Sequence, residues 1–293
     1  MAEQLKIWID GTLYNKEDAK ISVFDHCVLY GDGVFEGIRV YSNCIFRLEE
    51  HLERLWSSAN YLCLSIPITR EEMTEAIKET LRANKLKDGY IRLVVTRGVG
   101  DLGLDPRLCP KPTVFIIAAG IKLYPEADYQ NGLEIITASS TRMNVSAFNP
   151  RVKSCNYLNN IMGKMEGQLA NCREALMLNQ DGYVVECTGD NVFLVKDGVL
   201  YTPPIYLGPL RGITRDAIIE LAQKAGITVK EEPFTRFEVY DADEMFLTGT
   251  AAEAIPVVKV DGRLIRDGKV GPMTQKLIQD FRAIVTTDGV MVD

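Results

Sequence analysis

Histidine is scarce in this chain: only His26 and His51 occur among 293 residues. Two histidines make a histidine-based metal site or a serine–histidine–aspartate hydrolase hard to build. His51 falls in an amphipathic helical pattern, which favours packing or solvation over catalysis. His26 falls in an extended region, where a structural hydrogen bond is the better interpretation. We therefore expect no metal and look for the chemistry in lysine, carboxylates, tyrosine or a cofactor.

Three further absences narrow the class of protein. The longest apolar run, Val114 to Ala119, is far too short to cross a bilayer, and Met1 to Asp10 lacks the features of a signal peptide. No basic run offsets the net charge of -7, which argues against nucleic acid as a partner. The seven cysteines form no C-x-x-C pair and are odd in number, so we expect free thiols and a cytoplasmic location.

The composition is that of a soluble globular protein, with 46% apolar and 25% charged residues. The length allows two domains. We predict an N-terminal α/β domain over 1–120, a linker over 121–131 and a C-terminal domain over 132–293.

Strand and helix patterns mix along the chain. The first half predicts a hairpin over 5–14, a strand in the glycine-rich stretch 30–40, two amphipathic helices and strands over 90–96 and 113–119. Thr69 with Glu72 marks the start of the second helix. The second half predicts strands over 133–138, 175–178, 183–186, 191–195, 199–201, 244–248 and 255–260. It also predicts helices near Lys153, from Gly212 (with Ala225 on its apolar face) and from Pro272. This order predicts an α+β class with largely antiparallel sheets and packed helices.

The stretch from Arg151 to Asn160 carries the first candidate for chemistry. Lys153 is predicted where a loop passes into a helix, and Tyr157 follows four residues later. A lysine that attacks an aldehyde must lose its proton, which burial or cationic neighbours promote. The alternative is a solvated surface lysine, which describes most lysines.

Two turns can offer donors to an anion. Gly212-Ile213-Thr214 opens a predicted helix, where unpaired N–H groups, the helix dipole and a hydroxyl form an anion cup. A simple threonine N-cap is the alternative. Thr248 to Ala252 is a second small-residue turn after a strand. The glycines in Tyr30 to Val40 lack a following helix start, so a nucleotide fingerprint is rejected there.

Glu186 stands at a predicted strand end beside Gly189. An acid there is usually solvated, but a carboxylate that faces a protonated pyridine nitrogen would hold that proton in place. An amine for an imine, an acid for a ring nitrogen and two anion cups together match pyridoxal 5′-phosphate (PLP).

The sequence resembles the fold-type IV PLP-dependent enzymes, the D-amino-acid aminotransferase-like fold, and within them the branched-chain amino-acid aminotransferases. The resemblance covers nearly the whole chain. It is carried by Tyr30–Arg39, Phe46-Arg47, Tyr90–Arg92, Lys153–Asn160, Glu186–Phe193, Gly212–Asp216 and Gly249–Glu253.

The resemblance implies roles around the cofactor. Lys153 would form the Schiff base and move the reacting proton, Tyr157 would bind the ring hydroxyl oxygen, and Glu186 would pair with the ring nitrogen. The phosphate would be held by Arg47 and by the two cups, whose residues are Gly212, Ile213, Thr214, Gly249 and Thr250.

The resemblance also implies a substrate site. Thr250, Ala251 and Tyr90 would receive the α-carboxylate. Tyr30 and Phe35 would line an apolar pocket, with Gly37 among the substrate-binding residues, and Arg92 would meet the distal carboxylate of glutamate. The implied reaction is ping-pong transfer from L-leucine, L-isoleucine or L-valine to 2-oxoglutarate, in a homodimer or a higher homo-oligomer such as a hexamer.

Two departures keep other reactions open. The loop Arg97–Pro106 has no Arg-x-His carboxylate trap, which counts against a D-amino-acid transaminase but does not exclude it. The spacing between Lys153 and Tyr157 leaves the subclass of the family unsettled. The alternatives are a D-amino-acid or (R)-amine transaminase, an aminodeoxychorismate lyase, or a non-catalytic phosphate-ligand-binding protein. Cys155 and Cys187 flank the site residues, and we predict no role for them in turnover.

Overall fold

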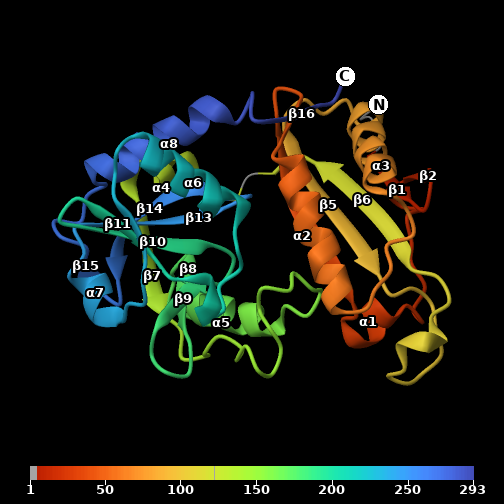
Figure 1. The fold of residues 1–293 in the computed structure, drawn as a ribbon, viewed down its shortest axis with the longest axis horizontal. Coiled ribbons are helices and arrows are strands. Elements are labelled where there is room, and N and C mark those ends of the chain that lie inside the picture. Colours follow the sequence, from red (N-terminus) through yellow and green to blue (C-terminus); the bar gives the residue numbers. More distant parts are fainter. Residues whose placement is uncertain (1–4, 122) are drawn as a thin grey trace. The chain divides into compact units, whose positions relative to one another are not determined.

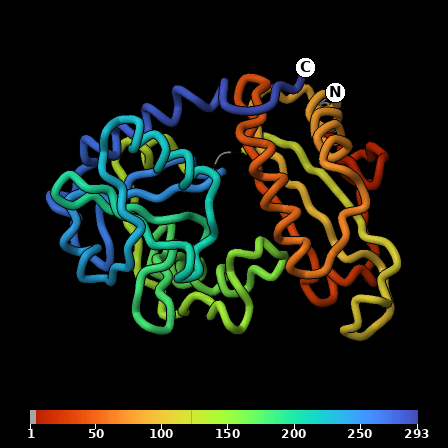
Figure 2. Tube along the Cα trace, viewed as in Figure 1, coloured from red at the N-terminus to blue at the C-terminus, as the bar shows by residue number. Residues whose placement is uncertain are grey.

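The computed structural model describes residues 5–121 and 123–293, and these form two compact units. The first unit contains the described residues up to Ile121 together with Val152–Asn156 and Val285–Asp293. The second unit contains residues 123–151 and Tyr157–Ile284. The path of the chain through each unit can be followed by colour in Figure 2.

A seven-stranded antiparallel sheet forms the first unit (Figure 1). Its spatial order is β16-β4-β3-β5-β6-β1-β2. The strands are β1 (Lys6–Ile9), β2 (Thr12–Asn15), β3 (Gly33–Tyr41), β4 (Cys44–Phe46), β5 (Gly89–Thr96), β6 (Thr113–Ala119) and β16 (Gly289–Met291).

Two helices pack on one face of this sheet, α2 (Leu48–Tyr61) on β3 and α3 (Arg70–Ala83) on β6. Alternate residues of β3, such as Val34 and Ile38, meet the apolar faces of both helices in one core. Thr69 and Glu72 form the predicted capping box at the start of α3. A short helix, α1 (His26–Tyr30), lies between β2 and β3 in the sequence. A single 3-10 turn, η1 (Pro106–Leu108), lies between β5 and β6.

The second unit holds a nine-stranded sheet in the order β12-β11-β10-β13-β14-β7-β8-β9, with β15 paired to β14. Most neighbours are antiparallel, but β7 runs parallel to both β8 and β14, and β11 runs parallel to β12. The strands are β7 (Leu133–Thr137), β8 (Glu174–Leu178), β9 (Val184–Cys187), β10 (Asn191–Lys196), β11 (Val199–Thr202), β12 (Val229–Glu231), β13 (Glu244–Gly249), β14 (Glu253–Val260) and β15 (Arg263–Leu264).

Aromatic stacking within the sheet and close contacts of its helices hold this unit together. Phe193 and Phe246 stack with ring centroids 4.9 Å apart on neighbouring strands. Helices α6 and α8 pack on β13, and α5 packs on β8 through Gly163 and Gly167. The helices are α4 (Glu126–Asn131), α5 (Leu158–Leu169), α6 (Ile213–Lys224), α7 (Arg236–Tyr240), α8 (Pro272–Ile284) and the 3-10 turn η2 (Ile205–Leu207).

The predicted α+β class with largely antiparallel sheets is confirmed. Three local predictions were wrong. His26 begins the helix α1 and is not extended, Lys153 lies before a helix that begins only at Leu158, and Ala225 is exposed although it was predicted on the apolar face of α6. The first error arises because a helix of only five residues carries little periodic signal.

The domain boundaries remain a prediction, and the compact units differ from them in two segments. Val152–Asn156 and Val285–Asp293 pack with the first unit, whereas the prediction placed them in the C-terminal domain. The predicted linker contains α4. Residue 122 of that linker and residues 1–4 of the segment tested for a signal peptide lie outside the described residues. None of the helices in the described part combines the length and apolar character needed to span a membrane.

Candidate active site

The backbone around Lys153 is fixed from two sides in the first unit. Its carbonyl oxygen accepts the N–H of Phe35 in β3 at 3.0 Å, and its own N–H donates to the hydroxyl of Ser58 in α2 at 3.1 Å. Two residues on, the N–H of Cys155 donates to the carbonyl of Gly33 at 2.8 Å. The segment therefore lies alongside the start of β3 and is hydrogen-bonded to it. The position of the lysine Cα is set before any ligand binds.

Four predicted substrate residues gather beside this lysine. The Nζ of Lys153 lies 4.6 Å from the centroid of the Phe35 ring, and the guanidinium carbon of Arg92 lies 4.5 Å from the same centroid. Arg92 also lies 5.6 Å from the ring of Tyr90. A Cβ on Gly37 would be 1.9 Å from the hydroxyl of Tyr90, so only glycine leaves room for it. The structure thus brings together Lys153, Phe35, Gly37, Tyr90 and Arg92.

Tyr30 has different neighbours. Its hydroxyl accepts the N–H of Gly103 at 3.0 Å, its ring packs edge-on against His26, and 42% of the residue is exposed. The role of Tyr30 in an apolar pocket therefore remains a prediction. His26 lies 2.9 Å from the carbonyl of Asp101, which is the structural hydrogen bond expected of it.

A buried ionic group lies between β3 and α2, and the sequence did not reveal it. Glu36 is paired with both Nε and Nη2 of Arg54, at 2.7 and 2.8 Å, and with Nδ1 of His51 at 2.8 Å. Burial alone would raise the pKa of Glu36, but the charges and hydrogen bonds of Arg54 and His51 outweigh it and lower that pKa. Glu36 is thus a carboxylate.

His51 is neutral in this group. Burial has the largest effect and lowers the pKa of His51; Glu36 opposes it, and Arg54 and Lys153 lower that pKa further. The Nε2 atom of His51 is buried without a hydrogen-bond partner among the described residues. The expectation of a packed or solvated histidine is therefore only partly right, since the ring is buried in a polar network. The one sequence feature that could have indicated this network is an acidic residue, Glu36, inside an apolar strand.

Arg47 lies at the opposite end of α2 from the lysine anchor. It is the N-cap residue with a φ of 46°, and its Nε is 2.8 Å from Asp288. At 1.5 Å per helical residue, Arg47 is roughly 16 Å along the helix axis from Ser58, whereas Arg54 is only about 6 Å from it. The phosphate role of Arg47 remains a prediction, and Arg54 is a second candidate that the sequence analysis missed.

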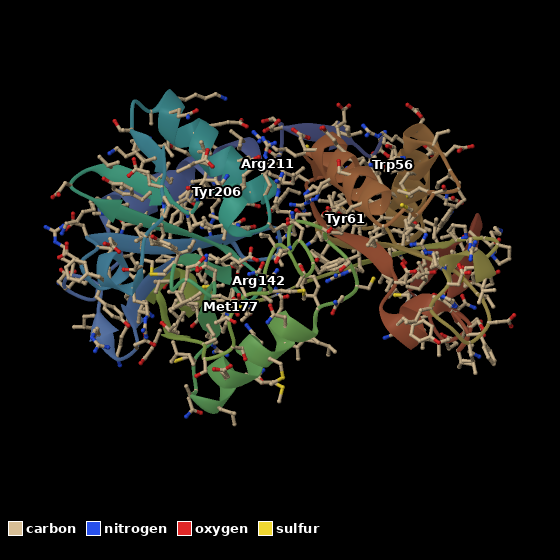
Figure 3. All side chains as sticks on the ribbon, turned by 60° about the horizontal axis from the view of Figure 1, so that its bottom comes forward. Trp56, Tyr61, Arg142, Met177, Tyr206 and Arg211 are labelled. Atoms are coloured by element: carbon tan, nitrogen blue, oxygen red, sulfur yellow. The ribbon has the colours of Figure 1, made fainter. Side chains whose placement is uncertain are left out.

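Glu186 is the centre of a second cluster, in the other unit. One of its oxygens accepts Nε of Arg142 at 2.7 Å, and the other accepts the N–H of Leu210 at 2.9 Å. Arg142, labelled in Figure 3, also donates to the side-chain oxygens of Asn159 and Asn160 at 3.0 Å. The cationic partner of the acid within the protein is therefore Arg142, and this pair is buried.

The Arg142 contacts also reach the helix that follows Tyr157. Asn159 and Asn160 lie in the first turn of α5, and Tyr157 is the half-buried N-cap residue of that helix. Arg142 therefore ties the strand that carries Glu186 to the helix start that carries Tyr157. No local pattern marked Arg142 in the sequence.

The first anion cup forms at the start of α6. Its N-cap residue is Gly212, with no side-chain cap, so Thr214 lies inside the first turn and the simple threonine N-cap is excluded. Within the described part of the chain, the N–H groups of Ile213 and Thr214 have no hydrogen-bond acceptor. A Cβ on Gly212 would lie 2.0 Å from the side-chain oxygen of Asn191, so glycine is required there.

The second cup is joined to the first through β10. Asn191 donates to the carbonyl of Leu210 at 2.8 Å and is the cross-strand partner of Thr248. The chain turns after Thr248 through Gly249, Thr250 and Ala251, all partly exposed. The hydroxyl of Thr248 is buried without a partner among the described residues. Glu186 and the two cups thus belong to one connected structure.

The two clusters match the chemical needs of PLP. Lys153 supplies a primary amine for the aldehyde, Glu186 an anion for the ring nitrogen, and the start of α6 supplies N–H donors for the phosphate. The residues present fit this cofactor. No group of three histidine, cysteine or acidic residues in the described ranges could hold a metal ion.

Comparison with known proteins agrees with this fit. The family model of amino-transferase class IV matches residues 33–260. The chain is 53% identical to a putative branched-chain-amino-acid aminotransferase of Methanocaldococcus jannaschii, over 98% of this chain and 99% of that protein. It is 42% identical to the branched-chain-amino-acid aminotransferase of Pseudomonas aeruginosa, over 96% and 92%.

Solved structures of branched-chain amino acid aminotransferases are also similar to this chain. A branched-chain amino acid aminotransferase solved with pyridoxamine 5′-phosphate superposes with a TM-score of 0.95 at 37% identity, covering 100% of both chains. The branched-chain amino acid aminotransferase of Escherichia coli superposes with a TM-score of 0.94 at 36% identity, covering 98% of this chain and 96% of that one. The chain therefore belongs to the class IV amino-transferase family, whose members depend on PLP.

Proposed function

We propose that this protein is a PLP-dependent transaminase that moves the amino group of L-leucine, L-isoleucine or L-valine to 2-oxoglutarate in a ping-pong reaction. The observation that carries the proposal is that Lys153 and Arg92 both lie over the ring of Phe35. An apolar ring beside the reactive amine suits an aliphatic side chain. A guanidinium on the same ring suits the second carboxylate of 2-oxoglutarate. The names of the relatives support the same substrates.

The residues that would hold the cofactor come from both clusters. PLP, when bound, supplies a protonated ring that withdraws electrons from the reacting carbon. Glu186 would keep the proton on the ring nitrogen, because its own charge is stabilised by Arg142 and by the N–H of Leu210. Tyr157 would donate to the ring oxygen.

The phosphate would receive several donors at once. The N–H of Ile213 and the hydroxyls of Thr214 and Thr250 would bind its oxygens, with Gly212 and Gly249 keeping side chains out of the cups. Arg47 or Arg54 would add a positive charge. Replacing each arginine by methionine distinguishes them, because loss of the phosphate ligand should weaken PLP binding about tenfold or more, as expected for a lost charge-assisted hydrogen bond.

Lys153 would move a proton at the reacting carbon after releasing the cofactor. Its ammonium form gains about 0.5–1 kcal/mol from the face of the Phe35 ring. The Ser58 and Phe35 hydrogen bonds keep its backbone in place while the side chain moves. Lys153 therefore combines a fixed backbone with a side chain that lies over an aromatic ring.

Arg92 gives a physical basis for accepting two unlike substrates. With an aliphatic side chain bound, the guanidinium would stay on the rings of Phe35 and Tyr90, as it does in the structure. With 2-oxoglutarate bound, it would meet the distal carboxylate. Thr250, Ala251 and the hydroxyl of Tyr90 would receive the α-carboxylate in both half-reactions.

The proposal is tested with the variants Lys153→Ala and Arg92→Met. Lys153→Ala should abolish turnover with L-leucine, and sodium borohydride should fix PLP to the Lys153 peptide of the unchanged protein alone. Arg92→Met should raise the KM for 2-oxoglutarate tenfold or more, the size of about 1.4 kcal/mol, with a smaller effect on L-leucine. Full activity of Lys153→Ala would refute the catalytic role of Lys153, and an unchanged protein that binds PLP without turnover would be only a ligand-binding protein.

We further propose a cytoplasmic location and a homodimer as the smallest active form, with a hexamer as a larger assembly. Seven cysteines without a disulfide support a reducing compartment. Sedimentation at micromolar concentration should give at least the mass of two chains. A monomer that turns over substrate at full rate would contradict the dimer.

A further inference from the structure

Two thiols meet above a glycine at the edge of the first sheet. A Cβ built on Gly33 would lie 3.2 Å from the sulfur of Cys27 and 3.2 Å from the sulfur of Cys155. The Cys155 thiol is also near enough to act on the pKa of Cys27 by hydrogen bonding. The two sulfurs are therefore neighbours although their residues are far apart in sequence, and the missing side chain of Gly33 makes room for both.

The backbones that carry these thiols are also close and well fixed. Cys155 is bound to β3 through the 2.8 Å hydrogen bond to Gly33, and the N–H of Cys27 donates to the side chain of Asp25 at 2.8 Å. A Cβ on Gly31 would lie 3.8 Å from the Cα of Asn156. A disulfide requires Cα atoms about 4.4–6.8 Å apart. The contact between the two segments and the adjacent sulfurs make Cys27 and Cys155 the pair to test against that requirement.

The chemistry of the pair differs between its members. The hydrogen bond from Cys155 lowers the pKa of Cys27, against the opposing effects of burial and of Asp25 and Asp32. The same hydrogen bond, followed by burial, raises the pKa of Cys155. Cys27 is thus the first thiolate and Cys155 the second thiol. Both residues are partly exposed in the chain, so a small reagent can reach them.

We propose that Cys27 and Cys155 form a dithiol modification site, at which an oxidant of the peroxide or disulfide class produces a Cys27–Cys155 disulfide. With a peroxide, the Cys27 thiolate attacks one oxygen, the O–O bond breaks, and a sulfenic acid and water form. The Cys155 sulfur then loses its proton, attacks the Cys27 sulfur and displaces water. Two thiols lose two electrons, and hydrogen peroxide becomes two molecules of water.

The disulfide would affect the position of Lys153, because Lys153 and Cys155 belong to the same backbone segment. Cys155 follows Lys153 by two residues in a segment held by Ser58 and β3. Forming the disulfide draws the sulfurs to about 2.05 Å and pulls this segment toward α1. We expect the oxidised enzyme to turn over more slowly, and this consequence rests on the proposed function.

The test uses the holoenzyme, hydrogen peroxide and peptide mapping without reduction. We expect one cross-linked peptide pair that contains Cys27 and Cys155, a loss of turnover of fivefold or more, and recovery with dithiothreitol. The variants Cys27→Ser and Cys155→Ser should keep the turnover of the reduced enzyme and resist the loss. Cys63→Ser removes an exposed thiol and is the matched control, which should respond like the unchanged protein.

Two results would overturn the proposal. One is oxidation of Cys63 without the Cys27–Cys155 pair, and the other is the cross-link with unchanged turnover. If the reduced protein has no transaminase activity, the proposed function has failed, and the peptide map still tests the dithiol by itself.

Discussion

Replacing Arg142 by methionine tests how the protein keeps Glu186 charged. The side chains of both residues are almost fully buried, and their contact is 2.7 Å. Among the described residues, the variant leaves Glu186 with the Leu210 N–H at 2.9 Å as its remaining donor. Removing one partner of a buried ion pair costs roughly 3–5 kcal/mol of unfolding free energy. We expect a loss in that range.

The same change should weaken the cofactor site. The variant removes the charged donor that stabilises and orients the Glu186 carboxylate, which would face the ring nitrogen. Hydrogen bonds to charged groups contribute about 1.5–3 kcal/mol and those between neutral groups about 0.5–1.5 kcal/mol. The difference, about 1–1.5 kcal/mol, corresponds to a rise of roughly 5–12-fold in the Kd of PLP.

The assay is a titration of the apo variant with PLP followed by absorbance, together with urea unfolding. Arg142→Lys keeps a charge but loses the planar fork, so its Kd should lie between the two. Arg173→Met is the matched control, because Arg173 is exposed and pairs with Asp128 at 3.2 Å. If Arg142→Met binds PLP and unfolds like the unchanged protein, our account of Glu186 is refuted.

Three further predictions concern other parts of the molecule. Gly37→Ala places a Cβ 1.9 Å from the Tyr90 hydroxyl, so the KM for L-leucine should rise about 5-fold or more, as overpacking costs about 1–3 kcal/mol, whereas Gly120→Ala, in open space, should change nothing. Burial, and then Glu174, raise the pKa of Asp190 to about 7 from 3.8, so the folded state binds an extra proton between these values and stability falls as pH rises toward 7. Urea unfolding of Asp190→Asn should show a flatter pH dependence, by up to about 1.4 kcal/mol per pH unit, and equal slopes would contradict this. Thr69→Ala should cost about 1 kcal/mol in urea unfolding through the lost cap of α3, and Thr74→Ala, in mid-helix, serves as its control.

Much of the fold follows from local patterns in the sequence. The apolar spacing of Leu48, Leu52 and Leu55 predicted α2, and the Thr69–Glu72 pair predicted where α3 begins. The glycine at Gly212 and the residues after it predicted the start of α6. These features depend on neighbours within one or two helical turns, and for that reason one sequence is enough to find them.

The parts that failed or were missed depend on distant residues. Arg142 meets Glu186 44 positions later, and Arg54 meets Glu36 18 positions earlier, so neither arginine differs from a surface charge until the fold is known. The phosphate role of Arg47 remains a prediction from its place in a motif, and its ion-pair partner Asp288 lies 241 positions away. Tertiary packing decides which charges are buried together, and periodicity does not record it.

The central claim is the transfer of an amino group from L-branched-chain amino acids through a cofactor held by Lys153. Its most direct test is the visible absorption spectrum of the purified protein, before and after L-leucine and then D-alanine. Our account predicts a yellow protein that bleaches with L-leucine, regains colour with 2-oxoglutarate and does not respond to D-alanine. Bleaching by D-alanine alone would contradict the substrate assignment, and a colourless protein that takes up no added PLP would contradict the function.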